Sequence, residues 1–164
     1  GGIAAVFDVK DGSDGSSASI TVENCRNDGD VSASVSGDFG FSGGIVASFA
    51  AGDDSSASIT IENCRNNGDV SASVSTGHSF AGGILGYGIG EAATGEAVTI
   101  RNCIVACDAI VSANEGGKEA YAHVISYVNA TKSNNGAKQG IAGDPVNDAN
   151  YAFDDTAETF GALR

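Results

Sequence analysis

The chain has 164 residues and 41% hydrophobic content, enough for the core of one domain, but it contains no Met or Trp and a single Pro. We therefore expect a thin core of small and β-branched side chains, which favours layers of β-strands over a bulky helical bundle. The formal net charge of −13 argues against nucleic acid as a partner, because phosphate binding needs clustered Lys and Arg. No apolar run approaches the ~20 residues that span a bilayer, so no membrane insertion is expected.

The chain opens inside a repeated element, without an initiator Met or a recognisable signal peptide. Its first residues, Gly1–Ile3, recur as Gly43–Ile45 and Gly82–Ile84. We therefore expect a mature or excised piece of a larger polypeptide, with further sequence upstream.

A repeat of 39 residues organises most of the chain. Three of the four cysteines recur at this interval: Cys25, Cys64 and Cys103. The segment Asp30–Ser36 recurs without a change as Asp69–Ser75. Near-identity at a fixed period indicates that each repeat forms one structural unit that packs on the next.

Each repeat carries three predicted strands, seen in the second copy at Ile45–Phe49, Ser58–Cys64 and Asp69–Ser75. Apolar residues alternate with Ser, Thr or Glu in the second and third of these, which is the pattern of a half-buried strand. Between them, Arg65–Gly68 predicts a turn, because Asn and Gly tolerate a positive φ angle.

Three strands with corners, repeated in register, predict an all-β fold: a single-stranded right-handed parallel β-helix of about three to four coils with roughly 39 residues per coil. Equivalent strands would stack ~4.8 Å apart. Two inward columns are expected, one of Ile20, Ile59 and Val98, the other of Val31, Val70 and Ala109. The alternative makes two coils of ~20 residues from each repeat.

We expect the β-helix to occupy residues 1–128, with coils at about 1–42, 43–81 and 82–121 and a partial fourth from 122. Residues 129–164 lose the pattern and are expected to form an irregular C-terminal cap. Its apolar residues are Tyr151, Phe153, Phe160 and Leu163. The first coil has no cap before it and is expected to expose a sheet edge.

The segments Gly82–Tyr87 and Ile61–Val70 resemble the GLUG motif family, whose pattern is Gly-Gly-Ile-Val-Gly followed by Ile-x-Asn-Cys-x-Asn-x-Gly-x-Val. The resemblance covers about residues 1–128, although Ala4-Ala5 and Val46-Ala47 depart from the usual Val-Gly. Family members are large bacterial surface or secreted proteins, including adhesin-like proteins and the non-catalytic region of some immunoglobulin A peptidases. The resemblance implies a β-helix at the bacterial cell surface or secreted.

Two columns of residues are expected to be structural. Stacked amides would hydrogen-bond along the axis at one corner: Asn24, Asn63 and Asn102. The column of Cys25, Cys64 and Cys103 predicts buried free thiols that act as small apolar fillers. The alternative is a local bridge between Cys103 and Cys107; the spacing of the cysteines does not fit a zinc site.

The candidate binding surface consists of aromatic residues in two segments expected to be displayed loops, 37–42 and 76–80. These residues are Phe39, Phe41, His78 and Phe80. Exposed rings beside polar groups could stack on a sugar or a protein. The alternative is that they simply cover a corner of the coil.

No catalytic residue, cofactor site or metal site is predicted. The acidic loops around Asp8, Asp11, Asp14, Asp53 and Asp54 leave a weak expectation of calcium, because the EF-hand spacing is absent. His78 and His123 fall in different parts of the repeat, with no nucleophile spaced to either.

The sequence thus predicts a non-catalytic β-solenoid module, a spacer or an adhesive surface that presents loops to a host or bacterial surface protein or a glycan. The alternative is a carbohydrate-active β-helix enzyme, a polysaccharide lyase or hydrolase or a remnant of one. That alternative requires carboxylates converging in one groove.

Overall fold

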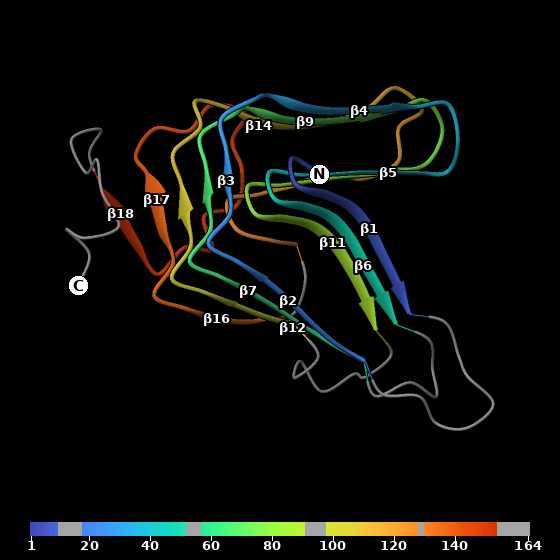
Figure 1. The fold of residues 1–164 in the computed structure, drawn as a ribbon. Helices are drawn as coiled ribbons and strands as arrows, with labels where there is room; N and C mark the ends of the chain where they lie inside the picture. Colours follow the sequence, from blue (N-terminus) through green and yellow to red (C-terminus); the bar gives the residue numbers. More distant parts are fainter. Residues whose placement is uncertain (10–17, 52–56, 91–97, 128–129, 154–164) are drawn as a thin grey trace.

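A computed structural model describes residues 1–9, 18–51, 57–90, 98–127 and 130–153, and this part of the chain is all β, without a helix (Figure 1). The first repeat forms β1(Ala4–Val9), β2(Ser19–Glu23), β3(Arg26–Asn27), β4(Val31–Val35) and β5(Phe39–Gly43). The second forms β6(Val46–Ala51), β7(Ser58–Glu62), β8(Arg65–Asn66), β9(Val70–Val74) and β10(His78–Gly82). The third forms β11(Leu85–Gly90), β12(Val98–Arg101), β13(Ile104–Val105), β14(Ile110–Asn114) and β15(Ala120–His123). Shorter strands follow: β16(Thr131–Ser133), β17(Gly136–Lys138) and β18(Tyr151–Phe153).

Each strand pairs in parallel with its counterpart in the next repeat, so the strands form five separate sheets. The sheets are β1-β6-β11, β2-β7-β12-β16, β3-β8-β13-β17-β18, β4-β9-β14 and β5-β10-β15. Parallel pairing of equivalent strands is compatible with a β-helix. The expected column of Ile20, Ile59 and Val98 is confirmed by the register.

The second expected column is wrong in its third member. Val31 pairs with Val70, but Val70 pairs with Ile110 rather than with Ala109. The cause is one additional residue in the third repeat, because Cys107–Ala109 replaces the pair Gly68-Asp69. Ile110 is fully buried, so the insertion keeps a large apolar side chain in the column.

The segments 37–42 and 76–80, expected to be displayed loops, instead lead into the strands β5 and β10. Their sheet packs face to face with the sheet β4-β9-β14 (Figure 1). The positions of β5 and β10 that face it hold small residues: a Cβ on Gly40 would lie 2.6 Å from Val74 Cγ1, and Ser79 Oγ accepts a hydrogen bond from Ser112 Oγ at 2.8 Å.

The Gly-Gly-Ile elements bring the chain back against the repeat beneath it. A Cβ on Gly43 would lie 2.6 Å from the Gly86 nitrogen, and one on Gly44 would lie 2.1 Å from the Gly83 carbonyl oxygen. Both glycines are therefore required by close approach. The isoleucine that follows, Ile45, is fully buried.

The core lies inside the second and third repeats. Its largest fully buried side chains include Phe49, Ile59, Ile61, Ile84, Leu85, Ile100, Ile110 and Ile125. No helix in the described residues is long and apolar enough to cross a membrane.

Three strands lie in the segment from 129 onward that was expected to be irregular. β16 pairs with β12, β17 with β13, and β18 with β17. Isolated bridges join Ala109 to Ala142 and His123 to Val146, so the chain keeps returning to the repeat before it over much shorter connections. Tyr151 and Phe153 lie in β18, whereas Phe160 and Leu163 fall outside the described residues.

Candidate functional site

The sheet β5-β10-β15 carries a column of stacked rings. Strand register places Phe39 opposite His78, and Phe41 opposite Phe80, which in turn lies opposite Tyr121. The ring centroids are 5.9 Å apart for Phe39 and His78, 5.7 Å for Phe41 and Phe80, and 5.1 Å for Phe80 and Tyr121. Such pairs contribute about 0.5–1.5 kcal/mol each beyond their buried area.

Two tyrosines from outside this sheet complete the column. Tyr87 of β11 stacks on Phe41 at 4.9 Å and lies 4.4 Å from Phe80. Tyr127, which follows β15, lies 4.4 Å from Tyr121 and 4.9 Å from Phe80. We call the seven residues the aromatic cluster: Phe39, Phe41, His78, Phe80, Tyr87, Tyr121 and Tyr127.

The aromatic cluster has a buried centre and an exposed end. Phe80 is only 4% exposed, whereas Phe39 is 54% exposed. Phe41, His78 and the three tyrosines are partly buried. Phe80 therefore holds the cluster together, while Phe39 and the tyrosine edges are accessible to a ligand.

Sequence reasoning found four of these residues and missed the three tyrosines. Tyr121 lies opposite Phe80 only because the third repeat is two residues longer by that point than the second. Tyr87 lies on another sheet, so only the folded chain brings it to Phe41. The Tyr121 hydroxyl donates to the Glu119 carboxylate, so the cluster also offers polar groups.

The three asparagines of the expected ladder share one backbone conformation. Asn24, Asn63 and Asn102 all adopt a positive φ of 53–54°, so they serve as left-handed corners. Asn134 joins them and donates from Nδ2 to Asn102 Oδ1 at 2.8 Å.

The buried amide pair lies three residues further along each repeat. Asn27 Nδ2 donates to Asn66 Oδ1 at 2.8 Å, and Asn66 Nδ2 donates to the Gly68 carbonyl at 2.8 Å. The segment 65–68, predicted as a turn, thus contains the short strand β8 and an inward amide.

All four cysteines are free, so the alternative bridge between Cys103 and Cys107 is absent. Cys64 Sγ and Cys103 Sγ donate at 3.6 Å to carbonyls of the preceding repeat. The hydrogen bond with the Cys64 thiol and burial both raise the pKa of Cys103, and burial raises the pKa of Cys107 to about 12. Thiols kept protonated in this way are poor nucleophiles.

A charged cluster lies where the strands shorten. Lys132 Nζ is 2.6 Å from Asp148 Oδ2, and His123 Nδ1 is 3.8 Å from the same oxygen. Asp148 also accepts the Ile125 N–H at 2.7 Å. Burial alone would raise the pKa of Asp148, but His123, Lys132 and the Ile125 N–H outweigh it and lower the pKa to about 2.

This cluster serves to close the core. Lys132 pairs in register with Ile100, so a lysine occupies an inward position that the earlier repeats fill with Ile or Val. Its ammonium group is neutralised by Asp148 and also donates to the Ser126 carbonyl at 2.7 Å.

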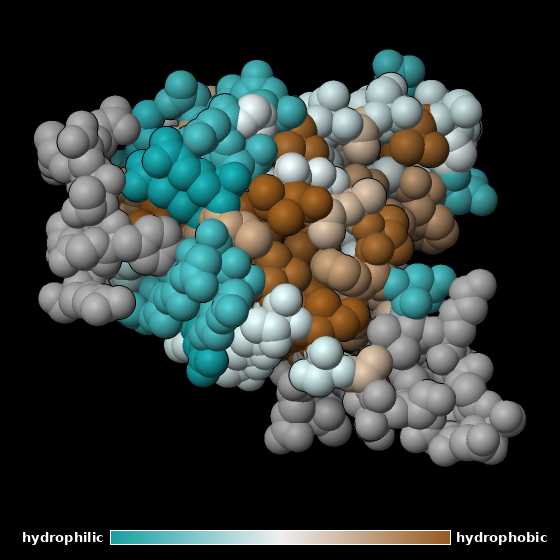
Figure 2. All heavy atoms as spheres, in the orientation of Figure 1, coloured by the Kyte–Doolittle hydropathy of each residue, from teal (hydrophilic) through white to brown (hydrophobic). Residues whose placement is uncertain are grey.

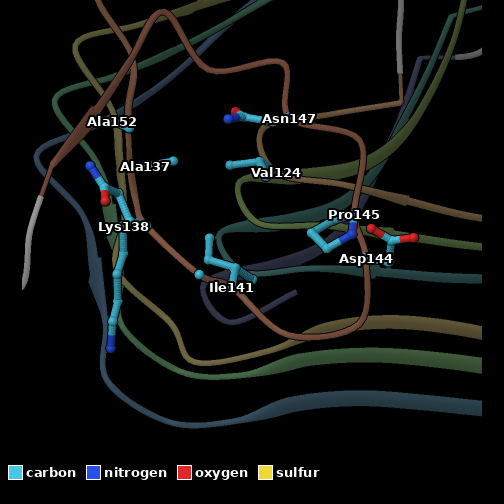
Figure 3. A pocket seen from close by; sticks show the side chains of 10 residues that line it. Val124, Ala137, Lys138, Ile141, Asp144, Pro145, Asn147 and Ala152 are labelled. Carbon is cyan, nitrogen blue, oxygen red and sulfur yellow. The ribbon is translucent and has the colours of Figure 1, made fainter.

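A cavity of about 260 Å³ opens inside the last turns of the chain (Figure 3). Val124, Ala137, Ile141 and Pro145 supply its apolar lining. The described residues contain no group of three or more His, Cys, Asp or Glu that could hold a metal ion. Of the acidic residues expected to bind calcium, Asp8 is exposed, and Asp11, Asp14, Asp53 and Asp54 lie outside the described residues.

Comparison of the chain with protein-family models, with curated proteins and with solved structures finds no match.

Proposed function

We propose that the chain is a non-catalytic, adhesin-like module of a bacterial cell-surface or secreted protein, which binds a surface protein or a glycan through the aromatic cluster. Its fold is a single-stranded right-handed parallel β-helix of about 39 residues per coil. The parallel pairing of equivalent strands and the GLUG-like residues support this fold. The rigid sheets keep the rings in one arrangement before a ligand arrives, which lowers the entropic cost of binding.

The aromatic cluster is the observation that carries the proposal. Aromatic rings bury large areas at low conformational cost, and tyrosine adds a hydroxyl at its edge. Phe39 leaves 54% of its surface exposed at one end of the column, beside the partly buried Phe41 and His78. A stacked, partly exposed column of this kind suits the apolar face of a sugar or the side chains of a partner protein.

The carbohydrate-active alternative requires two carboxylates that converge on one substrate bond. The charged cluster in the described residues contains a single carboxylate, Asp148, with Lys132 and His123. Its groups neutralise one another at the end of the core. The cluster therefore supports a structural role and favours the binding module.

A glycan array and a mucin-binding screen, followed by titration of each hit, test the proposal. Phe39→Ser should weaken binding about tenfold or more, because it removes the exposed ring while leaving Phe80 in place. Val35→Ser is the matched control, since Val35 is exposed in the same repeat but lies outside the aromatic cluster. Complete absence of glycan and protein ligands, or equal loss in both variants, contradicts the proposal.

A further inference from the structure

The first repeat ends every sheet to which it contributes. β1, β2, β3, β4 and β5 are each the terminal strand in the sheet order (Figure 1). We call the surface formed by these five strands the N-terminal end. Natural edge strands are usually blocked by charges, proline or bulges, yet β4 and β5 contain neither a charged residue nor a proline. The N-terminal end is therefore open to further strand pairing.

The same end exposes apolar residues that the second repeat buries. Val35 is 37% exposed, whereas its register partner Val74 is 1% exposed. Ile3 is 47% exposed, whereas Ile45, its counterpart in the Gly-Gly-Ile element, is fully buried. Val6 is 59% exposed. Figure 2 shows apolar side chains across the middle of the face on which the N terminus lies.

The polar side chains at the N-terminal end indicate which residues a preceding repeat would need in order to pair with it. Asp30 Oδ1 accepts the Asp69 N–H at 3.0 Å, and Asp69 Oδ1 accepts the Asp108 N–H at 2.9 Å. Each repeat thus supplies an aspartate to the N–H of the next. Asp30 itself is exposed, and within the described residues no aspartate faces its N–H.

The buried amides are also hydrogen-bonded from one repeat to the next in a fixed direction. Asn66 Oδ1 receives the Nδ2 group of Asn27 at 2.8 Å, from the repeat before it. Within the described part of the chain, Asn27 Oδ1 receives only its local Gly29 N–H, at 3.4 Å. A preceding repeat with an Asn and an Asp at these two positions would complete both patterns.

We propose that the N-terminal end binds a further β repeat of the same residue pattern, in parallel and in register, with an Asn above Asn27 and an Asp above Asp30. This interface goes beyond the proposed function, since it concerns the strand edges of the whole first repeat; it includes β5, so a bound repeat would also lie beside Phe39. A two-fold related copy of this chain fits less well, because its strands would run antiparallel to those of the first repeat, whereas all the pairings between repeats are parallel.

A copy stacked head to tail also fits less well. Its last described turn presents Ala152, the register partner of Ala137, in the column that contains Asn66. That turn offers no amide to Asn27. The hydrogen-bonding pattern therefore selects a repeat like the second one over either end of another copy.

The test adds a second copy of residues 43–81 in front of Gly1 of the full chain. Hydrogen exchange of the amides in β2 and β4 should slow at least ~10-fold and approach the rates in β7 and β9, because edge strands become central ones. The matched control carries Val→Asp at the added copies of Val70 and Val74, so that the added segment cannot pack. Unchanged exchange in β2 and β4, or equal slowing with the control, overturns the proposal.

Sedimentation of the unmodified chain over a range of concentrations tests the competing occupant. The expected result is a monomer whose β2 and β4 amides exchange faster than those of β7 and β9 at every concentration. A dimer that Val35→Asp abolishes would show that a second copy covers this end, and it would overturn the proposal. Ligand binding at Phe39 is measured separately, so failure of one proposal is distinguishable from failure of the other.

Discussion

The two ends of the repeat array are built differently. At the N-terminal end, Ile20 and Val31 are partly exposed in the same pattern that buries Ile59 and Val70 one repeat later. At the other end, Lys132 replaces an inward Ile or Val, and a short chain segment carrying Asp148 covers it. The N-terminal end keeps the apolar core pattern of the later repeats, whereas the other end replaces it with a charged pair.

Asparagine side chains satisfy backbone groups at the end opposite the N-terminal end. Asn135 precedes Gly136, the partner of Ile104, and so occupies the position of Cys103. Its Oδ1 accepts the Cys103 N–H at 2.9 Å, its Nδ2 donates to the Ile100 carbonyl at 2.8 Å, and its own N–H donates to Asn150 Oδ1 at 2.7 Å. The difference teaches that ending such a core requires polar groups that satisfy one another, as in the capping units of repeat proteins.

The largest expected effect comes from equivalent core positions in consecutive repeats. Ile59→Ala should lower the free energy of unfolding by about 2–5 kcal/mol, because Ile59 is 1% exposed and its loss leaves a cavity. Ile20→Ala should cost clearly less, because Ile20, the register partner of Ile59, is already partly exposed. Denaturant unfolding measures both. Equal losses would mean that the N-terminal end is covered in solution.

The next effect breaks the charge pair that closes the other end. Asp148→Asn should cost about 2–3 kcal/mol, because it removes the anionic partner of the Lys132 ammonium group, whose side chain is only 17% exposed. The double variant with Lys132→Met should recover most of that loss. The matched control is Asp28→Asn at the N-terminal end, whose pair with Arg26 is more than half exposed and should show no measurable change. A harmless Asp148→Asn would contradict a closing role.

The smallest effect is a loss of stability in acid. The pKa of Asp148 falls from its ordinary 3.8 to about 2 in the folded chain, so its stabilisation is present above about pH 4 and is lost as the pH falls toward 2. The amount is about 2 kcal/mol. The basic groups that face the carboxylate are His123 and Lys132. Urea unfolding at several pH values should show the decline in the wild type and a smaller one in Asp148→Asn.

The repeat period was sufficient to predict which strands pair. Ser19–Glu23 lies opposite Ser58–Glu62 because the copies are of equal length, so every inward residue meets its own counterpart. The same reasoning failed at Ala109, where one inserted residue shifts the register. A period predicts pairing only while connections keep their length, since a slip of one residue reverses the face of every side chain.

The two strands that carry most of the aromatic cluster, β5 and β10, have a weak strand pattern in the sequence. The sequence predicts loops at 37–42 and 76–80, where the strands β5 and β10 contain Gly40, Ser42 and Ser79. They are nonetheless buried, because the facing sheet lies so close that larger side chains would collide. Strand recognition by apolar alternation fails where small residues are selected by close packing.

The order of residues within one repeat determined the parallel pairing, the inward isoleucines and the glycines at the tight returns, because each depends on local pattern and a fixed period. Only the tertiary structure decided that Tyr87 and Tyr127 join Phe80, that Asn66 rather than Asn63 is the buried amide, and that Lys132 meets Asp148. These contacts join different sheets or turns of unequal length. Their formation depends on the lengths of the connections between strands, which a local sequence pattern does not specify.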